Sequence, residues 1–178
     1  GQVTSGGGIV GTGANGASPH HHVSDTRLQA GDAVVIDFGG LYKGYCSDMT
    51  RTIHVGEPSP EFQRVYAIVL EANQRAFEAV RPGVVTESID KVARDHITEA
   101  GYGEQFLHRT GHGIGLEVHE NPYIVRGNDV VLEEGMTFSI EPGIYLEGNF
   151  GVRIEDLVVV KADGAQRLNK TPHSLPVL

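Results

Sequence analysis

Residues 33–55 read AVVIDFGGLYKGYCSDMTRTIHV, in which two runs rich in β-branched residues flank a centre of Gly, Tyr and Lys. Such runs on either side of a turn are typical of a β-hairpin. Asp37 and Asp48 are equidistant from the point between Tyr42 and Lys43. A strand pairing that is symmetric about this point would place the two aspartates opposite each other, with their Cβ atoms ~4.5–5.5 Å apart.

Residues 137–160 predict a second hairpin that opposes two acids. Glu141 and Glu155 are equidistant from Gly148, which would occupy the turn. Pro142 has no N–H to donate to a ladder, so a slip of one residue in this register is also open. The sequence therefore predicts two pairs of facing carboxylates, one in each hairpin.

Facing carboxylates need a neutralising partner, because two of them about 5 Å apart repel by roughly 3 kcal/mol at an effective dielectric constant of ~20. Solvent, or the nearby Lys43, Arg51 or Arg153, could neutralise any single acid. Asp37 and Glu155, however, lie within apolar runs where an unpaired charge is costly. Taken jointly, the acids predict a site for two divalent cations, and Mn, Fe, Co or Zn pairs with oxygen-rich ligands serve in hydrolysis.

The rest of the chain predicts two helices between the strands. Ser59-Pro60 would cap and begin an amphipathic helix that ends at Pro82-Gly83, and Thr86 would cap a second helix that ends before Gly101. A short strand around Ile9-Val10 would open the chain, followed by a loop. This order predicts an α+β fold, in which the helices cover one face of an antiparallel sheet.

Composition narrows the class of protein. The 178 residues fit one domain, with 39% apolar and 21% charged residues as in ordinary globular proteins. The formal charge of −9 argues against a nucleic-acid partner. No apolar run approaches the ~20 residues of a membrane helix, so we expect no membrane partner. The single cysteine, Cys46, fits a reducing compartment, and we expect a cytoplasmic protein.

Residues 11–16 match the dinucleotide-binding pattern GxGxxG, with Asp37 downstream. That pattern requires a helix to begin at its last glycine. Here Ala17-Ser18-Pro19 and three histidines follow instead. We therefore expect no dinucleotide site.

Residues 110–120 read TGHGIGLEVHE and contain His112 and His119 among glycines that let the backbone approach a metal or a substrate. The helical zinc-protease signature is absent, because Tyr123 stands where its second histidine would be and Pro122 would break a helix. The run from His20 to His22 is equally compatible with an ordinary polar loop.

Together these segments resemble the pita-bread metallopeptidases, a family that includes methionine aminopeptidase, aminopeptidase P and prolidase. The matching stretches follow the family's order through nearly the whole chain: PH at 19–20, VIDFG at 35–39, SDMTRT at 47–52, GHGIG at 111–115, VHE at 118–120, SIEPG at 139–143 and GVRIED at 151–156. The last stretch looks like the proline-specific branch. The resemblance implies the pita-bread fold, a curved antiparallel sheet with helices on its outer face.

The resemblance also implies the site. Five residues would ligate two divalent metal ions, with Mn favoured over Co, Zn or Fe: Asp37, Asp48, His112, Glu141 and Glu155. Glu141 would also move the proton of a metal-bridging water, and His20 and His119 would contact the substrate and stabilise the tetrahedral intermediate. Arg153 shares a strand face with Glu155, and we expect it either to anchor the substrate end or to pair with the acids.

The expected reaction is hydrolysis of the bond between an N-terminal residue and a following proline in a dipeptide or short peptide. The alternatives are a methionine aminopeptidase-like activity and a non-catalytic binding module on the same fold. Creatinase shares the fold but lacks the metal ligands, and all five are present here. We expect residues 1–178 to form one catalytic domain without the first helices and the N-terminal domain of proline-specific members. One side of the sheet would then be exposed, and association into a homodimer is a further expectation.

Overall fold

The structure is a computed structural model and describes residues 4–178. In chain order, its elements are β1 Thr4–Thr12, the 3-10 helix η1 Gly13–Ala17, β2 Ala33–Tyr42, β3 Tyr45–His54, α1 Pro60–Ala79, α2 Thr86–Glu99, the 3-10 helix η2 Gly103–Gln105, β4 Gly111–Gly113, β5 Glu120–Ile124, β6 Thr137–Ile140, β7 Gly143–Leu146, β8 Phe150–Arg153, β9 Asp156–Lys161 and β10 Gly164–Arg167.

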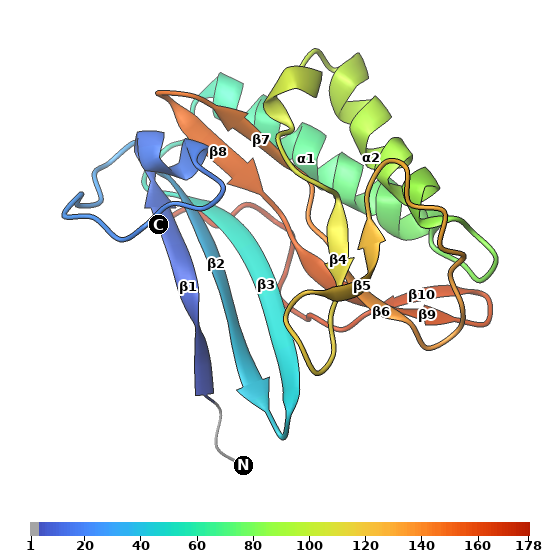
Figure 1. Ribbon diagram of the computed structural model, residues 1–178. Helices are drawn as coiled ribbons and strands as arrows, with labels where there is room; N and C mark the ends of the chain where they lie inside the picture. The colour runs from blue at the N-terminus through green and yellow to red at the C-terminus, as the bar shows by residue number, and fades with distance from the viewer. Residues whose placement is uncertain (1–3) are drawn as a thin grey trace.

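The strands form three antiparallel groups. One sheet has the order β1-β2-β3, a second has the order β10-β9-β6-β4-β5, and β7 and β8 form a two-stranded ribbon. Helices α1 and α2 pack against each other and lie together on one side of these strands (Figure 1). The predicted α+β fold is confirmed.

Helix α1 begins as the sequence predicts. Pro60 occupies the first turn, and the Ser59 hydroxyl oxygen accepts a hydrogen bond from the Phe62 N–H at 3.1 Å. Its buried face packs into one core with α2 and the central strands: Phe62, Val65, Val69, Ala72, Ala76, Ile89, Ala93, Ile97, Phe138, Ile140, Val152, Ile154 and Val158. This core fixes the layer of strands against the helices.

Helix α2 corrects one prediction. Val85 is the N-cap residue and Thr86 is the first helical residue, so the prediction of a Thr86 cap is wrong. The Thr86 hydroxyl is buried and donates to the Asn128 carbonyl at 2.9 Å. The loop at Asn128 provides this acceptor, and no local pattern around Thr86 indicated it.

The first hairpin differs from the predicted register. Tyr42 pairs with Tyr45, so Lys43 and Gly44 form a two-residue turn, with φ angles of 51° and 87°. Such a turn needs positive φ at both residues and moves the centre of pairing toward the C-terminus. Asp37 therefore pairs with Thr50, and Asp48 pairs with Gly39. The prediction of directly opposed aspartates is wrong, but alternation keeps Asp37 and Asp48 on the same face as diagonal neighbours.

The second hairpin has the predicted register. Gly143 pairs with Arg153 in the β7-β8 ribbon, and Ile140 pairs with Asp156 between β6 and β9. Both pairs are symmetric about Gly148, so no slip occurs at Pro142. Glu141 and Glu155 lie in the short interruption between the two ladders.

The glycine segment of residues 11–16 makes a close backbone contact. It includes the end of β1 and most of η1, and no α-helix begins at Gly16, as expected. A Cβ atom on Gly151 of β8 would lie 1.9 Å from the Gly16 carbonyl oxygen. These glycines therefore allow η1 to lie against β8. This contact fixes the position from which the next segment carries His20 to the cleft.

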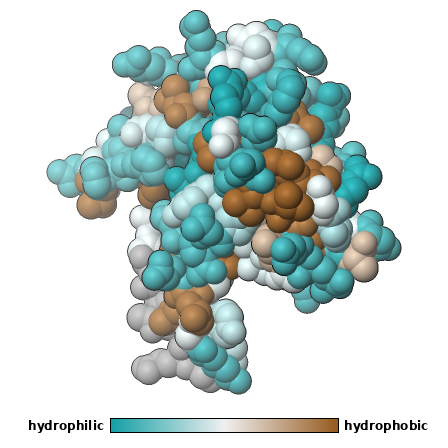
Figure 2. Space-filling view, turned by 45° about the vertical axis from the view of Figure 1, so that its right-hand side comes forward, coloured by the Kyte–Doolittle hydropathy of each residue, from teal (hydrophilic) through white to brown (hydrophobic). Residues whose placement is uncertain are grey.

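Part of the surface is apolar. Figure 2 shows a mostly hydrophilic face on which apolar side chains gather in one larger patch. On the three-stranded sheet, Val10 and Phe38 lie on the face opposite to Asp37 and are 59% and 49% exposed. Within residues 4–178, no helix combines the length and the hydropathy needed to cross a membrane.

Candidate metal centre

A cleft of about 460 Å³ lies between the first hairpin and the second sheet. All the predicted site residues line it: His20, Asp37, Asp48, His112, His119, Glu141, Arg153 and Glu155. The structure thus brings together side chains from β2, β3, β4 and the two ends of the interrupted ladder. Its walls are rich in carboxylates, which suit a cationic ligand.

Three of the predicted ligands form the compact centre of this group. One ligand atom from each of Asp48, His112 and Glu155 lies within 4.8 Å of the others. The His112 Nε2 atom is 3.2 Å from Glu141 Oε1 and 3.8 Å from Asp48 Oδ2. The His112 Nδ1 atom is 3.1 Å from the Gly113 carbonyl and can donate its proton there, which leaves Nε2 free to ligate.

Glu155 gives the clearest indication that the donor set fits a cation. Its side chain is buried, and its Oε2 atom accepts a hydrogen bond from the Thr50 hydroxyl at 2.6 Å. Among the described residues, its Oε1 atom is buried without a hydrogen-bond partner. Burial raises the pKa of Glu155 well above its usual range, and the carboxylates of Glu141, Asp48 and Asp37 add to the shift. A divalent cation would satisfy the orphan oxygen and reverse this penalty, so the donor set fits a metal.

The other acids respond to the same crowding. Burial raises the pKa of Asp48 to about 7, and the charges of Asp37 and Glu141 add to it. Burial would also raise the pKa of Glu141, but the hydrogen bond and charge of His112 outweigh it, and the pKa falls to about 2. Without a bound cation, Asp48 and Glu155 therefore keep their protons to higher pH than Glu141 does, as expected where like charges converge.

Arg153 holds Asp37 at one edge of the cleft. The Arg153 side chain is 3% exposed, and its Nη2 donates to Asp37 Oδ2 at 2.6 Å. Its Nε and Nη1 atoms donate to the Thr50 and Tyr145 hydroxyl oxygens at 3.2 and 2.8 Å. Arg153 thus has most of its donors engaged with the protein, which matches the expected pairing with acids more closely than substrate anchoring.

Two histidines complete the cleft. The His119 ring meets the His112 ring edge to face, with centroids 4.2 Å apart. Burial lowers the pKa of His119, and the charges of His112 and Arg109 lower it further. His20 also lines the cleft.

The comparisons with known proteins agree with this geometry. The model of metallopeptidase family M24 matches residues 2–162. The chain belongs to this family. It is 57% identical over 171 residues to a probable dipeptidase PepE of Mycobacterium tuberculosis, an alignment that covers 96% of this chain and 46% of the relative.

Solved structures of M24 relatives superpose closely. Recombinant prolidase from Thermococcus sibiricus matches with a TM-score of 0.94 and 51% identity over 96% of this chain and 47% of that one. The X-Pro aminopeptidase from Thermotoga maritima matches with a TM-score of 0.95 and 49% identity over 98% of this chain and 51% of that one. This M24 chain therefore spans about half the length of the relatives it matches, and the pita-bread fold is confirmed.

The sequence did not indicate every residue that lines this M24 cleft or contacts its side chains. Thr50 could have been found, because it lies two residues from Asp48 and so on the same strand face. Tyr145 and His108 gave no signal: the His108 Nε2 atom lies 2.8 Å from the Tyr145 hydroxyl only because β7 brings the two together. Arg109 also lines the cleft, and its Nε atom is buried without a hydrogen-bond partner among the described residues.

Proposed function

We propose that this chain is the catalytic part of a dinuclear metallopeptidase that cleaves the bond between an N-terminal residue and a following proline. The observation that carries this proposal is the buried, unpartnered Oε1 atom of Glu155 beside Asp48 and His112. The prolidase and X-Pro aminopeptidase relatives support the proline-specific reaction. A methionine aminopeptidase-like activity gains no support from these relatives.

Five side chains would hold the two metal ions: Asp37, Asp48, His112, Glu141 and Glu155. Four carboxylates and one imidazole form an oxygen-rich set of ligands. Such a set suits Mn, whereas thiolate-rich sets suit Zn. When bound, the ions would supply a water of lowered pKa and polarise the scissile carbonyl. The protein's contribution is to orient these ligands and to move protons.

Glu141 is suited to the proton transfer by its position. Its carboxylate lines the cleft beside His112, where it could accept a proton from the attacking water and pass it to the leaving proline nitrogen. His119 is suited to donate a hydrogen bond, because its lowered pKa keeps the imidazole neutral with one N–H. His119 and His20 would then stabilise the oxyanion of the tetrahedral intermediate.

Arg109 is the cation with free capacity to bind the substrate end. Within residues 4–178, no carboxylate forms an ion pair with its guanidinium, which lies 5.2 Å from the Tyr123 ring centroid. Its charge acts on both His112 and His119, so it lies within electrostatic reach of the reacting groups. In an Xaa-Pro dipeptide the C-terminal carboxylate is close to the scissile bond, and Arg109 could pair with it there. This arrangement favours a dipeptide over a longer peptide.

The test combines metal content with hydrolysis. Purified protein, stripped with EDTA and reloaded with Mn, is analysed for bound metal and assayed on Ala-Pro, Ala-Pro-Ala and Met-Ala. We expect two ions per chain and cleavage of the proline peptides that is lost on chelation. Asp48→Asn should lose both, whereas Glu71→Gln, which changes a surface acid of α1, should keep both. Full hydrolysis after exhaustive chelation would overturn the proposal.

Cytoplasmic location and a homodimer stay predictions.

A further inference from the structure

The buried side chain of Asn73 connects helix α1 to the two backbone positions that directly precede the glutamate ligands. Asn73 is fully buried on the inner face of α1. Its Nδ2 atom donates to the Ile140 carbonyl at 2.9 Å and to the Ile154 carbonyl at 3.1 Å. These residues directly precede Glu141 and Glu155 in the chain. One amide group therefore bridges the two backbone positions from which the glutamates project.

The need for this bridge follows from Pro142. The Ile154 N–H donates to the Pro142 carbonyl at 3.4 Å, which is one half of a hydrogen-bonded antiparallel pair. The reciprocal bond, from residue 142 to the Ile154 carbonyl, cannot form because proline has no N–H. The Asn73 amide supplies a donor to that same carbonyl. It thus replaces a ladder bond at the one position where the ladder between the two glutamates is broken.

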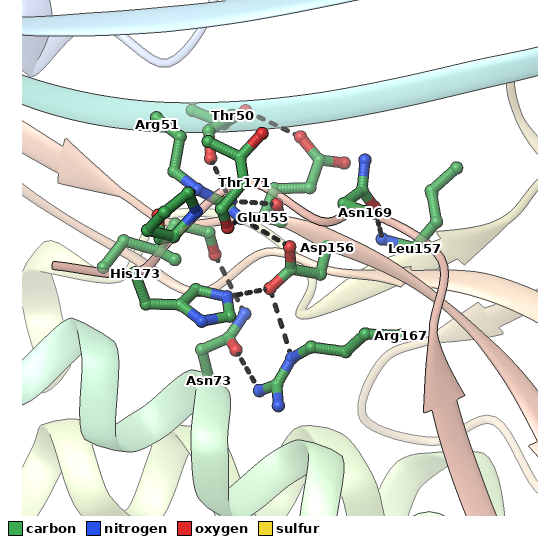
Figure 3. A network of polar contacts seen from close by, with 12 residues as sticks. Thr50, Arg51, Asn73, Glu155, Asp156, Leu157, Arg167, Asn169, Thr171 and His173 are labelled. Atoms are coloured by element: carbon green, nitrogen blue, oxygen red, sulfur yellow. Dashed lines mark hydrogen bonds and ion pairs between the residues drawn. The ribbon is translucent and has the colours of Figure 1, made fainter.

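The orientation of the amide is fixed by a second contact. The Asn73 Oδ1 atom accepts from Arg167 Nη2 at 2.9 Å, so the NH₂ group must face the two carbonyls. Arg167 in turn pairs with Asp156 Oδ2 through its Nε atom at 3.3 Å. Figure 3 shows this chain of contacts running from Asn73 through Arg167 and Asp156 to Arg51 and His173.

The same network holds the backbone of Glu155 from the other side. Arg51 Nη1 donates to the Glu155 carbonyl at 2.6 Å, and Arg51 Nη2 pairs with Asp156 Oδ1 at 2.7 Å (Figure 3). The Glu155 N–H donates to the Thr50 carbonyl at 3.1 Å. Asn73 bonds to the backbone directly before both glutamates, and neither of these hydrogen bonds involves a carboxylate.

We propose that Asn73 is a positioning residue that sets the separation of Glu141 and Glu155 for metal binding. The inference rests on the proposed function, because it takes these glutamates as metal ligands. Loss of the two amide donors should change the metal affinity and the metal geometry, in addition to any change in overall stability. Residues outside the ligand set commonly affect metal affinity about 10–100-fold when they orient the ligands.

The experiment measures Co(II) binding to the metal-free chain by calorimetry, together with the visible absorption spectrum of bound Co(II) and the melting temperature in EDTA. Asn73→Leu removes the amide at similar volume. Asn73→Asp also removes both donors but keeps the acceptor for Arg167, and it carries the comparison if the Leu variant does not fold. Gln74→Leu is the matched control, because the Gln74 side chain also accepts from Arg167 but contacts neither Ile140 nor Ile154.

We expect each Asn73 variant to bind Co(II) at least about tenfold more weakly, with an altered spectrum, and Gln74→Leu to stay within about twofold of the parent. Adding Pro142→Ala to Asn73→Leu restores a backbone N–H opposite Ile154 and should recover part of the affinity. An Asn73 variant that melts lower but binds Co(II) with parental affinity and spectrum would reduce Asn73 to a stability role. Failure of Pro142→Ala to recover any affinity would equally overturn the inference. If the parent protein itself binds no Co(II), the proposed function fails instead.

Discussion

Arg153 Nη2 donates to Asp37 Oδ2 at 2.6 Å, so the one arginine predicted to meet the substrate is bound to a predicted metal ligand. The pair is buried on the arginine side and fixes the Asp37 carboxylate through a charge-assisted hydrogen bond. Arg153→Lys should misplace Asp37, because an ammonium cannot reproduce the planar fork that also reaches Tyr145 and Thr50. We expect kcat/KM to fall about 10–100-fold, equally for Ala-Pro and for its C-terminal amide. A loss confined to the free acid would instead assign Arg153 to the substrate carboxylate.

Arg109 gives the opposite expectation. Replacing it with Gln removes the unpaired charge that we assign to the C-terminal carboxylate, so Ala-Pro should lose activity while Ala-prolinamide does not. A hydrogen bond to a charged group contributes about 1.5–3 kcal/mol, which corresponds to a loss of roughly 10–150-fold. The measurement is the ratio of kcat/KM for the two substrates, with Arg126→Gln on a surface loop as the control. An unchanged ratio in Arg109→Gln would exclude it as the anchor.

Asp48→Asn should stabilise the metal-free protein at high pH although it destroys metal binding. The folded-state pKa of Asp48 is raised to about 7, above its usual 3.8, so the folded state binds the proton more tightly than the unfolded state. Its contribution to the free energy of unfolding is therefore present below pH ~4 and is lost as the pH rises through about 7. We expect the Asn variant to be more stable than the parent at pH 8, by at most about 4 kcal/mol, and equal to it near pH 3.5.

Chemical denaturation in EDTA at several pH values measures this difference. Loss of the Asp48 charge also relieves Glu155, whose raised pKa includes a contribution from Asp48, so the gain at high pH contains both effects. Asp95→Asn, at an exposed position of α2, should show no such pH-dependent gain. If Asp48→Asn proves less stable than the parent at pH 8 in EDTA, burial and neighbouring charges do not destabilise the ionised Asp48 carboxylate as inferred.

Gly151→Ala should be strongly destabilising. The new Cβ atom would lie 1.9 Å from the Gly16 carbonyl oxygen, so η1 must move away from β8. We expect a loss of at least about 2 kcal/mol, as for other overpacked sites, and weaker substrate binding because His20 follows η1. Gly127→Ala is the control: its φ of 81° is strained for alanine, but no atom lies within 4 Å, so it should lose only about 1 kcal/mol. Equal melting temperatures for the two variants would contradict the close contact.

The sequence predicted the α+β order, the start of α1 and the register of the second hairpin, because these depend on local periodicity and on a turn centred on glycine. It failed at the first hairpin, since the Lys43-Gly44 turn moved the centre of pairing and placed Thr50 opposite Asp37. Tyr145, His108 and Asn73 could not be inferred, because their roles depend on contacts between segments that are distant in the chain. The predicted register was wrong, but Asp37 and Asp48 still lie close together because diagonal neighbours share a face of the sheet.

The five candidate ligands are distributed from residue 37 to residue 155, and the two helices lie in the chain between the first hairpin and the other three ligands. A metal ion therefore cannot nucleate this fold locally, as it does in a zinc finger whose ligands are a few residues apart. Closing such long loops is entropically costly and slow, so the ligands converge near the end of folding. Metal binding should then stabilise the folded state but not the transition state for folding. The rate of folding would be insensitive to Mn, while the rate of unfolding would fall as the ion concentration rises.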